Sequence, residues 1–181
     1  MKRASLRRNA SAAFARLRPI LGGAVLGLAG LSFAWALVLG SGAAWGHHGF
    51  GGRYDLSAPV WIEGEVTRAY FGQPHAELVI RVADDLGVPA APPDLGSAAT
   101  FLDPGRLQVR ADMRGASVEV ELPPTQKYFS LGERIAVGDR IAIIAVRNCD
   151  PPHQLNGQWL RLADGEIVAR AGAMSYMVGG C

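Results

Sequence analysis

The residues best suited to chemistry in this sequence are four histidines, and all of them lie beyond residue 46. His47 and His48 are adjacent, His75 follows a predicted turn, and His153 comes after two consecutive prolines. Neutral imidazole is the commonest side-chain ligand of copper, zinc and nickel in proteins. We therefore take His47, His48 and His75 as candidate metal ligands, and the affinity order of divalent metals makes copper the preferred ion.

The chemistry of His47 depends on where the chain is cut ahead of it. Cleavage after Gly46 would make His47 the N-terminal residue, whose amine and imidazole could chelate copper as in a histidine brace. If Trp45 came first, a free amine, two backbone amides and the imidazole could bind Cu(II) or Ni(II) in a square plane. In the alternative interpretation, the two histidines are only a polar terminus and His75 only caps a strand or bonds its turn.

Convergence of these histidines requires that the segment holding His47 and His48 folds back to the barrel end marked by His75. About 12 residues separate this segment from the first predicted strand at Val60. An extended run of that length reaches up to about 40 Å, which is ample for the return.

Two cysteines, Cys149 and Cys181, form an even pair that could close a loop of 33 residues, counted inclusively. Such a bond would stabilise the fold by about 3.7 kcal/mol on the chain-entropy estimate. Two free thiols, or a bond between molecules through Cys181, are the alternatives. Cys149 and His153 could together hold a metal, but the two prolines between them favour a simple turn.

Catalytic patterns are weak in this sequence. The serines lack a nucleophile-elbow context, and no phosphate-binding loop, dinucleotide fingerprint, CxxC or His-Glu-x-x-His motif occurs. Glu63 and Glu65 would lie about 7 Å apart on one strand face, yet alternating acids are far commoner on a solvated face. We therefore predict no enzyme, and a copper oxidase is a minor alternative that only the brace-like terminus supports.

The first 46 residues have the order of an export signal. A basic segment over 1–18 precedes an apolar segment over 20–39 and a run of small residues over 41–46. We expect a cleaved signal peptide; the alternative is an uncleaved anchor, since 20 apolar residues span about 30 Å. Either interpretation predicts an exported, periplasmic body that meets the membrane only through residues 1–46.

The charge of the body argues against binding of nucleic acid. The whole chain has 18 basic and 16 acidic residues, and six of the basic ones lie in residues 1–46. Residues 47–181 therefore hold 12 basic against 16 acidic residues, a net charge of −4. A protein that neutralises phosphates needs the opposite sign.

Apolar residues in the body alternate with period two, which predicts strands. The predicted strands cover residues 60–68, 75–82, 117–122, 159–162 and 166–169, with a short one over 106–112. Residues 137–146 are expected to form a glycine-aspartate turn that leads into a buried strand, and residues 127–135 one helical turn. The proline-rich stretch at about 88–105 is expected to be an inserted loop, and Asp164-Gly165 a hairpin turn. This pattern predicts an all-β fold, a small OB-like barrel of about five strands, behind a hydrophobic leader helix.

The sequence also resembles a family of exported bacterial proteins, domain of unknown function 6152. The resemblance rests on His47-His48-Gly49-Phe50, the strand Glu63-Gly64-Glu65-Val66, the turn Gln73-Pro74-His75 and the turns Val137-Gly138-Asp139 and Leu162-Ala163-Asp164-Gly165. Gly49 and Gln73 depart from the usual Ser and Asn of the family. The resemblance implies export and a β-rich domain, and it implies no reaction.

Together these features predict one β-barrel domain over residues 47–181, with a C-terminal tail, that binds copper for metal holding or delivery without catalysis. A metal-free module that binds an envelope protein is the alternative. The partner, the oligomeric state and the identity of the metal are left open by the sequence.

Overall fold

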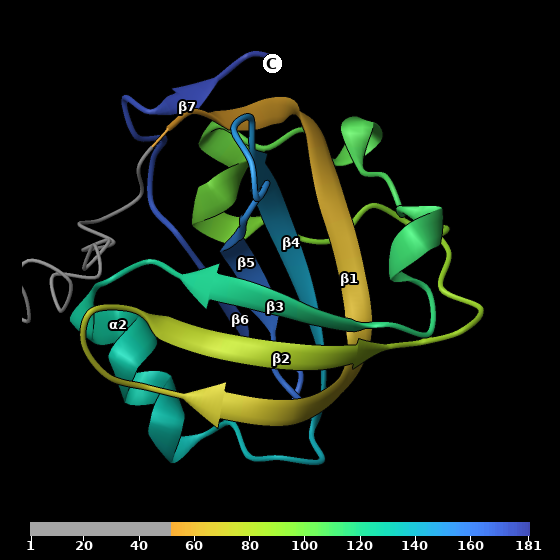
Figure 1. The fold of residues 1–181 in the computed structure, drawn as a ribbon, viewed down its shortest axis with the longest axis vertical. Coiled ribbons are helices and arrows are strands. Elements are labelled where there is room, and N and C mark those ends of the chain that lie inside the picture. Colours follow the sequence, from red (N-terminus) through yellow and green to blue (C-terminus); the bar gives the residue numbers. More distant parts are fainter. Residues whose placement is uncertain (1–51) are drawn as a thin grey trace, which may run out of the picture. The chain divides into compact units, whose positions relative to one another are not determined.

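Seven strands within residues 52–181, the part of the chain that the computed structural model describes, form one sheet (Figure 1). The strands are β1 (Tyr54–Tyr70), β2 (Ala76–Val82), β3 (Ser117–Leu122), β4 (Arg140–Asn148), β5 (Leu155–Arg161), β6 (Ile167–Ala169) and β7 (Met177–Val178). The helical segments are short: η1 (Gly96–Thr100), η2 (Pro104–Arg106), η3 (Ala111–Met113), α2 (Gln126–Phe129) and η4 (Ser130–Glu133).

Five of these strands close on themselves as a barrel in the order β1-β2-β3-β5-β4-β1. Neighbours in the barrel are antiparallel except β3 and β5, which are parallel and pair only at Glu121 and Asn156. Outside the barrel, β6 pairs with β5 and β7 runs parallel to the start of β1. The predicted OB-like barrel of five strands is therefore confirmed.

The long strand β1 closes the barrel because it pairs on both of its sides. Its middle pairs with β4 over Val60–Glu65, and its second half pairs with β2 from Gly64 onward. Irregularities in the pairing lie after Asp55 and after Val66, where bulges add twist and let a strand bend. β1 also starts at Tyr54, earlier than the strand predicted from Val60.

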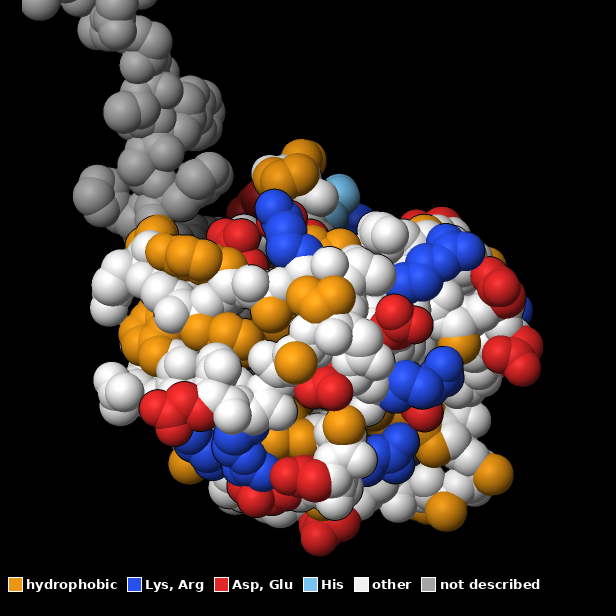
Figure 2. Space-filling model, turned by 90° about the horizontal axis from the view of Figure 1, so that it is seen from below, with side chains coloured by type: hydrophobic (Ala, Val, Ile, Leu, Met, Phe, Trp, Pro, Cys, Tyr) orange, Lys and Arg blue, Asp and Glu red, His pale blue; other side chains and the backbone are white. Residues whose placement is uncertain are grey.

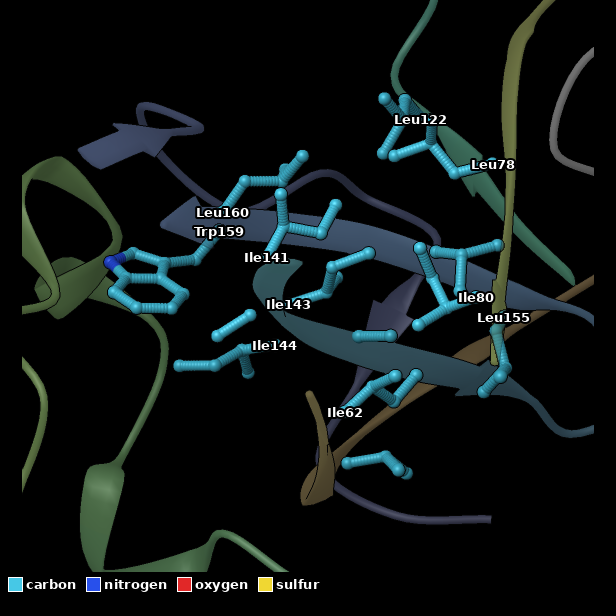
Figure 3. Packing of buried hydrophobic residues seen from close by; sticks show 14 of the residues in the cluster. Ile62, Leu78, Ile80, Leu122, Ile141, Ile143, Ile144, Leu155, Trp159 and Leu160 are labelled. Carbon is cyan, nitrogen blue, oxygen red and sulfur yellow. The ribbon is translucent and has the colours of Figure 1, made fainter. Parts of the chain in front are cut away.

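Alternating apolar side chains fill the barrel interior, as a barrel of this size requires. Ala76, Leu78, Ile80 and Val82 of β2 are each at most 1% exposed, as their alternation predicted. Figure 3 shows Leu78, Ile80 and Leu122 with Ile62, Ile141 and Ile143 in this packing.

A second apolar layer lies outside the barrel, and the proline-rich segment packs against it. Trp61, Ile144 and Trp159 are cross-strand neighbours, and the two indole rings lie 5.7 Å apart. The indole N–H of Trp159 donates to the Asp94 carbonyl oxygen at 2.9 Å. The segment over residues 84–107 also buries four leucines and an alanine, namely Leu86, Leu95, Ala98, Leu102 and Leu107. It is therefore a packed cover and not only an inserted loop.

Two further predictions about local structure differ in outcome. The short strand predicted over 106–112 is wrong, because this stretch contains η2 and η3 and touches the sheet through one bridge between Val60 and Gln108. The helical turn predicted over 127–135 is confirmed by α2 and η4. The predicted hairpin at Asp164-Gly165 is confirmed, since it joins the antiparallel strands β5 and β6.

The described surface pairs opposite charges closely. Arg134 lies 2.6 Å from Glu166 and 2.8 Å from Asp164. Figure 2 shows basic and acidic side chains next to one another over the face seen from below. On this face the charges are mixed and do not form a basic stripe. No helix within residues 52–181 is long and apolar enough to cross a membrane.

Candidate functional site

A cleft of about 480 Å³ lies where β3 and β5 separate. Because these strands pair only at Glu121 and Asn156, the first half of β3 leaves its edge toward β5 unpaired. Three segments of the chain line the cleft. The first surrounds η3 and contains Arg110, Asp112 and Met113, and the second is β3, with Glu119 and Glu121. The third runs from the end of β4 to the start of β5 and contains Arg147, Pro152, His153, Gln154 and Leu155. Figure 1 shows the β4–β5 loop above β3. Ligand sites of OB barrels commonly use this loop.

The β4–β5 loop is held in one shape by several local constraints. Cys149 is bonded to Cys181. His153 has a φ of 62°, the left-handed conformation that non-glycine residues rarely adopt. Its backbone N–H donates to the Asp150 carbonyl oxygen at 2.9 Å, which supports this turn.

The ring of His153 has a defined tautomer in its neutral form. Its Nδ1 lies 3.1 Å from the carbonyl oxygen of Asn148, which can only accept a hydrogen bond. Nδ1 therefore carries the proton, and Nε2 is the nitrogen left to accept a hydrogen bond in the neutral ring.

Glu121 is the buried acid of the cleft, with 8% of its surface exposed. It accepts a hydrogen bond from Nε2 of Gln154, whose Oε1 in turn accepts from the Tyr54 hydroxyl at 3.1 Å. Burial, followed by the charges of Glu77 and Glu119, raises the pKa of Glu121 to about 7. Glu121 is therefore present in both protonation states near neutral pH, as is common for acids in binding and active sites.

The arginines of the cleft differ in their partners. Arg110 donates to Asp112 at 2.8 Å, and this hydrogen bond is the largest cause of the lowered pKa of Asp112. On the β3 side, Glu119 is paired with Arg68 at 2.6 Å. Arg147 makes no side-chain hydrogen bond or ion pair with any residue in 52–181. Among the described residues, Arg147 is therefore the cation of the cleft that forms no ion pair, and its charge is the smallest of the causes that lower the pKa of Asp112.

The predicted metal ligands fall partly outside the structure. His75 lies directly before β2, after a cis Gln73–Pro74 bond, and is 5% exposed. It does not line the cleft. His47 and His48 lie outside the described residues. Within residues 52–181, no three His, Cys, Asp or Glu side chains are grouped closely enough to hold a metal ion. The three-histidine site therefore stays a prediction.

The predicted pairing of Cys149 with Cys181 is confirmed by a disulfide with a Cα–Cα distance of 5.4 Å. The two alternatives, free thiols and a bond between molecules, are thereby wrong. The bond also removes a metal site made of Cys149 and His153. Disulfides persist in oxidising compartments, so this one is consistent with a location outside the cytoplasm.

Sequence reasoning missed the residues that meet in the cleft. Glu121 occupies a strand position where an acid normally faces water, and Gln154 and Arg147 belong to no recognised motif. The only available signal was the cluster of two prolines and a histidine in the β4–β5 loop, which indicated a turn. The carboxylate pair considered above is not part of the cleft, since neither Glu63 nor Glu65 lines it. Glu63 lies 3.5 Å from Arg161.

The family comparison covers the first half of the barrel. A family model described as "Family of unknown function (DUF6152)" matches residues 36–126. This protein belongs to the DUF6152 family. The resemblance seen in the sequence is thus confirmed. No curated protein matches the chain.

The DUF6152 match divides the cleft between two parts of the chain. Residues 36–126 include β1, β2 and β3, and therefore Arg110, Asp112, Glu119 and Glu121. Arg147 and the β4–β5 loop lie beyond the match. His47, His48 and His75 lie inside it.

Proposed function

We propose that this DUF6152 protein is an exported, non-catalytic binding module that takes a polar ligand into the cleft beside β3. The observation that supports this most is that one cleft of about 480 Å³ contains a buried acid, Glu121, and a cation, Arg147, that forms no ion pair within residues 52–181. That volume lies in the range of small-molecule sites, which use a few placed polar groups for specificity.

A binding role fits the chemistry of the lining better than catalysis does. The residues that line the cleft include no serine, threonine or cysteine that could act as a nucleophile beside His153. The Nδ1 of His153 bonds a backbone carbonyl oxygen, whereas the base of a catalytic pair is oriented by a third side chain. These features support ligand binding without bond cleavage.

A nuclear magnetic resonance titration of the exported protein tests this proposal. Separate titrations with organic acids, ammonium compounds, amides and sugars would follow the amide signals of Glu121, Arg147 and Gln154. We expect at least one class to shift these signals saturably while Gly165, in the distant β5–β6 turn, stays unchanged. If no class moves the cleft signals, or if Gly165 shifts equally, the cleft is not a binding site.

Copper holding or delivery through His47, His48 and His75 is the second candidate function. The observation that favours it is the burial of His75 directly before the start of β2. A side chain that is already buried loses little further conformational entropy when it binds a metal. If residues 1–46 are removed as a signal peptide, the amine of His47 would add a further ligand.

The mass of the exported protein, followed by copper titration of that species, tests this second candidate. We expect a mature chain that lacks residues 1–46, located in the periplasm. His75→Ala should weaken copper binding tenfold or more, and His153→Ala should leave it unchanged. Circular dichroism would verify that both variants keep their fold. Equal copper uptake by His75→Ala and the unaltered protein would exclude a site shared by the three histidines. Recovery of the full-length chain in the membrane fraction would support an uncleaved N-terminal anchor.

Binding of an envelope protein is one form that the cleft function could take in this compartment. The β4–β5 loop and the β3 edge could receive an extended segment of a partner, as sheet edges often do. The nuclear magnetic resonance titration would also show which of its compound classes such a segment must contain to bind in the cleft.

A further inference from the structure

We propose that the cleft binds the carboxylate of an organic acid or of a peptide C-terminus, and that Arg147 anchors this group. The proposal rests on the binding function inferred above and extends it by naming the ligand chemistry and the residue that recognises it.

The position of Arg147 suits an anchor. Its backbone pairs with Asp55 of β1 on one side and with Leu155 of β5 on the other. The side chain therefore starts from a strand that is held on both edges, and a fixed start lowers the entropic cost of binding. A guanidinium presents parallel N–H donors that match the two oxygens of a carboxylate.

The other charges of the cleft already have partners. Arg110 is bound to Asp112 at 2.8 Å, and Glu119 is bound to Arg68 at 2.6 Å. Glu121 accepts the hydrogen bond from Gln154. A cationic ligand would have to compete for these acids. An anion would displace no ion pair of Arg147 within residues 52–181, because the charge of Arg147 acts on Asp112 only without direct contact.

The walls of the cleft also accommodate more than a charged group. Met113, Pro152 and Leu155 line it beside the polar residues, and its volume of about 480 Å³ exceeds that of a simple ion. Apolar contact with these side chains would bind the organic body of the ligand while Arg147 holds its head. We therefore expect a carboxylate attached to a small apolar group.

Two pairs of probes test this inference on the exported protein. Hexanoate and hexanamide differ only in the carboxylate, and acetyl-Ala-Leu with a free C-terminus differs in the same way from its amide. Cleft amide signals would report the affinity for each. We expect each acid to bind at least tenfold more tightly than its amide, and the stronger of the two acids would show whether a free acid or a chain end is the better source.

Substitutions then assign the effect to one residue. Arg147→Gln should weaken binding of the preferred acid tenfold or more, and Arg147→Lys should weaken it less. Arg140→Gln is the matched control, because Arg140 lies on the same strand and does not line the cleft. It should change the affinity less than twofold.

Several results would overturn the inference. Equal binding of acids and amides by the unaltered protein would do so without any variant, which matters if Arg147→Gln failed to fold. The inference would also fail if Arg147→Gln and Arg140→Gln weakened binding of the preferred acid equally, or if the unaltered protein bound neither acid. If another compound class still shifted the cleft signals, the binding function would stand and only the carboxylate inference would fail.

Discussion

At the scale of single residues, Glu121 is where the fold departs most from ordinary surface chemistry. The side chain is 8% exposed, and its charge interacts with Glu77, Glu119 and Tyr54. Asp112, Arg147 and His153 line the same cleft. Burial is the largest cause of the raised pKa of Glu121. Between pH 4.5 and about 7, the Glu121 carboxyl group therefore tends to keep its proton in the folded protein and to lose it in the unfolded chain.

This raised pKa sets the sign of a pH effect on stability. Between the ordinary pKa of 4.5 and about 7, the folded state binds more protons at Glu121 than the unfolded state does. The stabilising contribution of Glu121 is thus full below pH 4.5 and is lost as the pH rises through 7. Above that range the folded protein contains a buried, ionised carboxylate.

Glu121→Gln should therefore stabilise the protein at alkaline pH. Glutamine keeps the shape and an oxygen that accepts from Gln154, and it cannot ionise. We expect its free energy of unfolding to exceed that of the unaltered protein by about 1–3 kcal/mol at pH 8, and by much less at pH 5. Urea denaturation at both pH values measures this difference.

The exposed Glu133 provides a matched control, because Glu133→Gln removes a carboxylate that is not buried. A stability gain from Glu121→Gln that does not depend on pH would show that ionisation of Glu121 is not its cause.

At the scale of elements, β1 determines whether the barrel closes. Gly64 pairs with Val82 of β2 and with Ile141 of β4, so it lies where β1 belongs to both sides of the barrel. A Cβ atom built at Gly64 would lie 2.1 Å from the carbonyl oxygen of Arg81. The contacted atom belongs to the backbone, and a side chain could be fitted only by moving β2.

Gly64→Ala should destabilise the protein strongly for this reason, by about 3 kcal/mol or more. Gly87→Ala is the control, since a Cβ there meets nothing within 4 Å, and it should change stability by about 0.5 kcal/mol or less. Thermal denaturation of both variants gives the comparison. Similar melting temperatures for Gly64→Ala and Gly87→Ala would mean that β1 and β2 can move apart at Gly64 with little loss of stability.

At the scale of the whole described body, the disulfide joins the C-terminus to the loop that borders the cleft. Cys181 ends the chain and Cys149 follows β4, while β7 pairs with Tyr54 and Asp55 at the start of β1. The tail therefore folds back over the strand ends and is tied there. Loss of the bond would free both the tail and the loop that contains His153.

Cys181→Ser should lower the free energy of unfolding by about 3–4 kcal/mol, the value expected for a loop of this length. Chemical denaturation measures the loss, and reduction of the unaltered protein should reproduce it. Reductant should not affect the variant further. A variant as stable as the oxidised protein would show that β7 holds the tail without the bond.

The sequence by itself determined the strands whose pattern depends on near neighbours. Alternation in residues 76–82 predicted β2 and its inward face, and Asp164-Gly165 predicted a hairpin, because side-chain direction and turn geometry are local properties. The two cysteines limited the pairing to one choice within the chain. The histidines suggested a metal site, which stays a prediction because His47 and His48 lie outside the described residues.

Only the tertiary structure decided where the cleft lies and what it contains. Arg147 and Glu121 are 26 positions apart in the sequence, and they share a cleft because β3 and β5 separate after a single pairing. Glu121 is buried and bonded to Gln154, which lies 33 positions away in the sequence, and burial is the largest cause of its raised pKa. Desolvation depends on every neighbour in space, and no local pattern of residues encodes it.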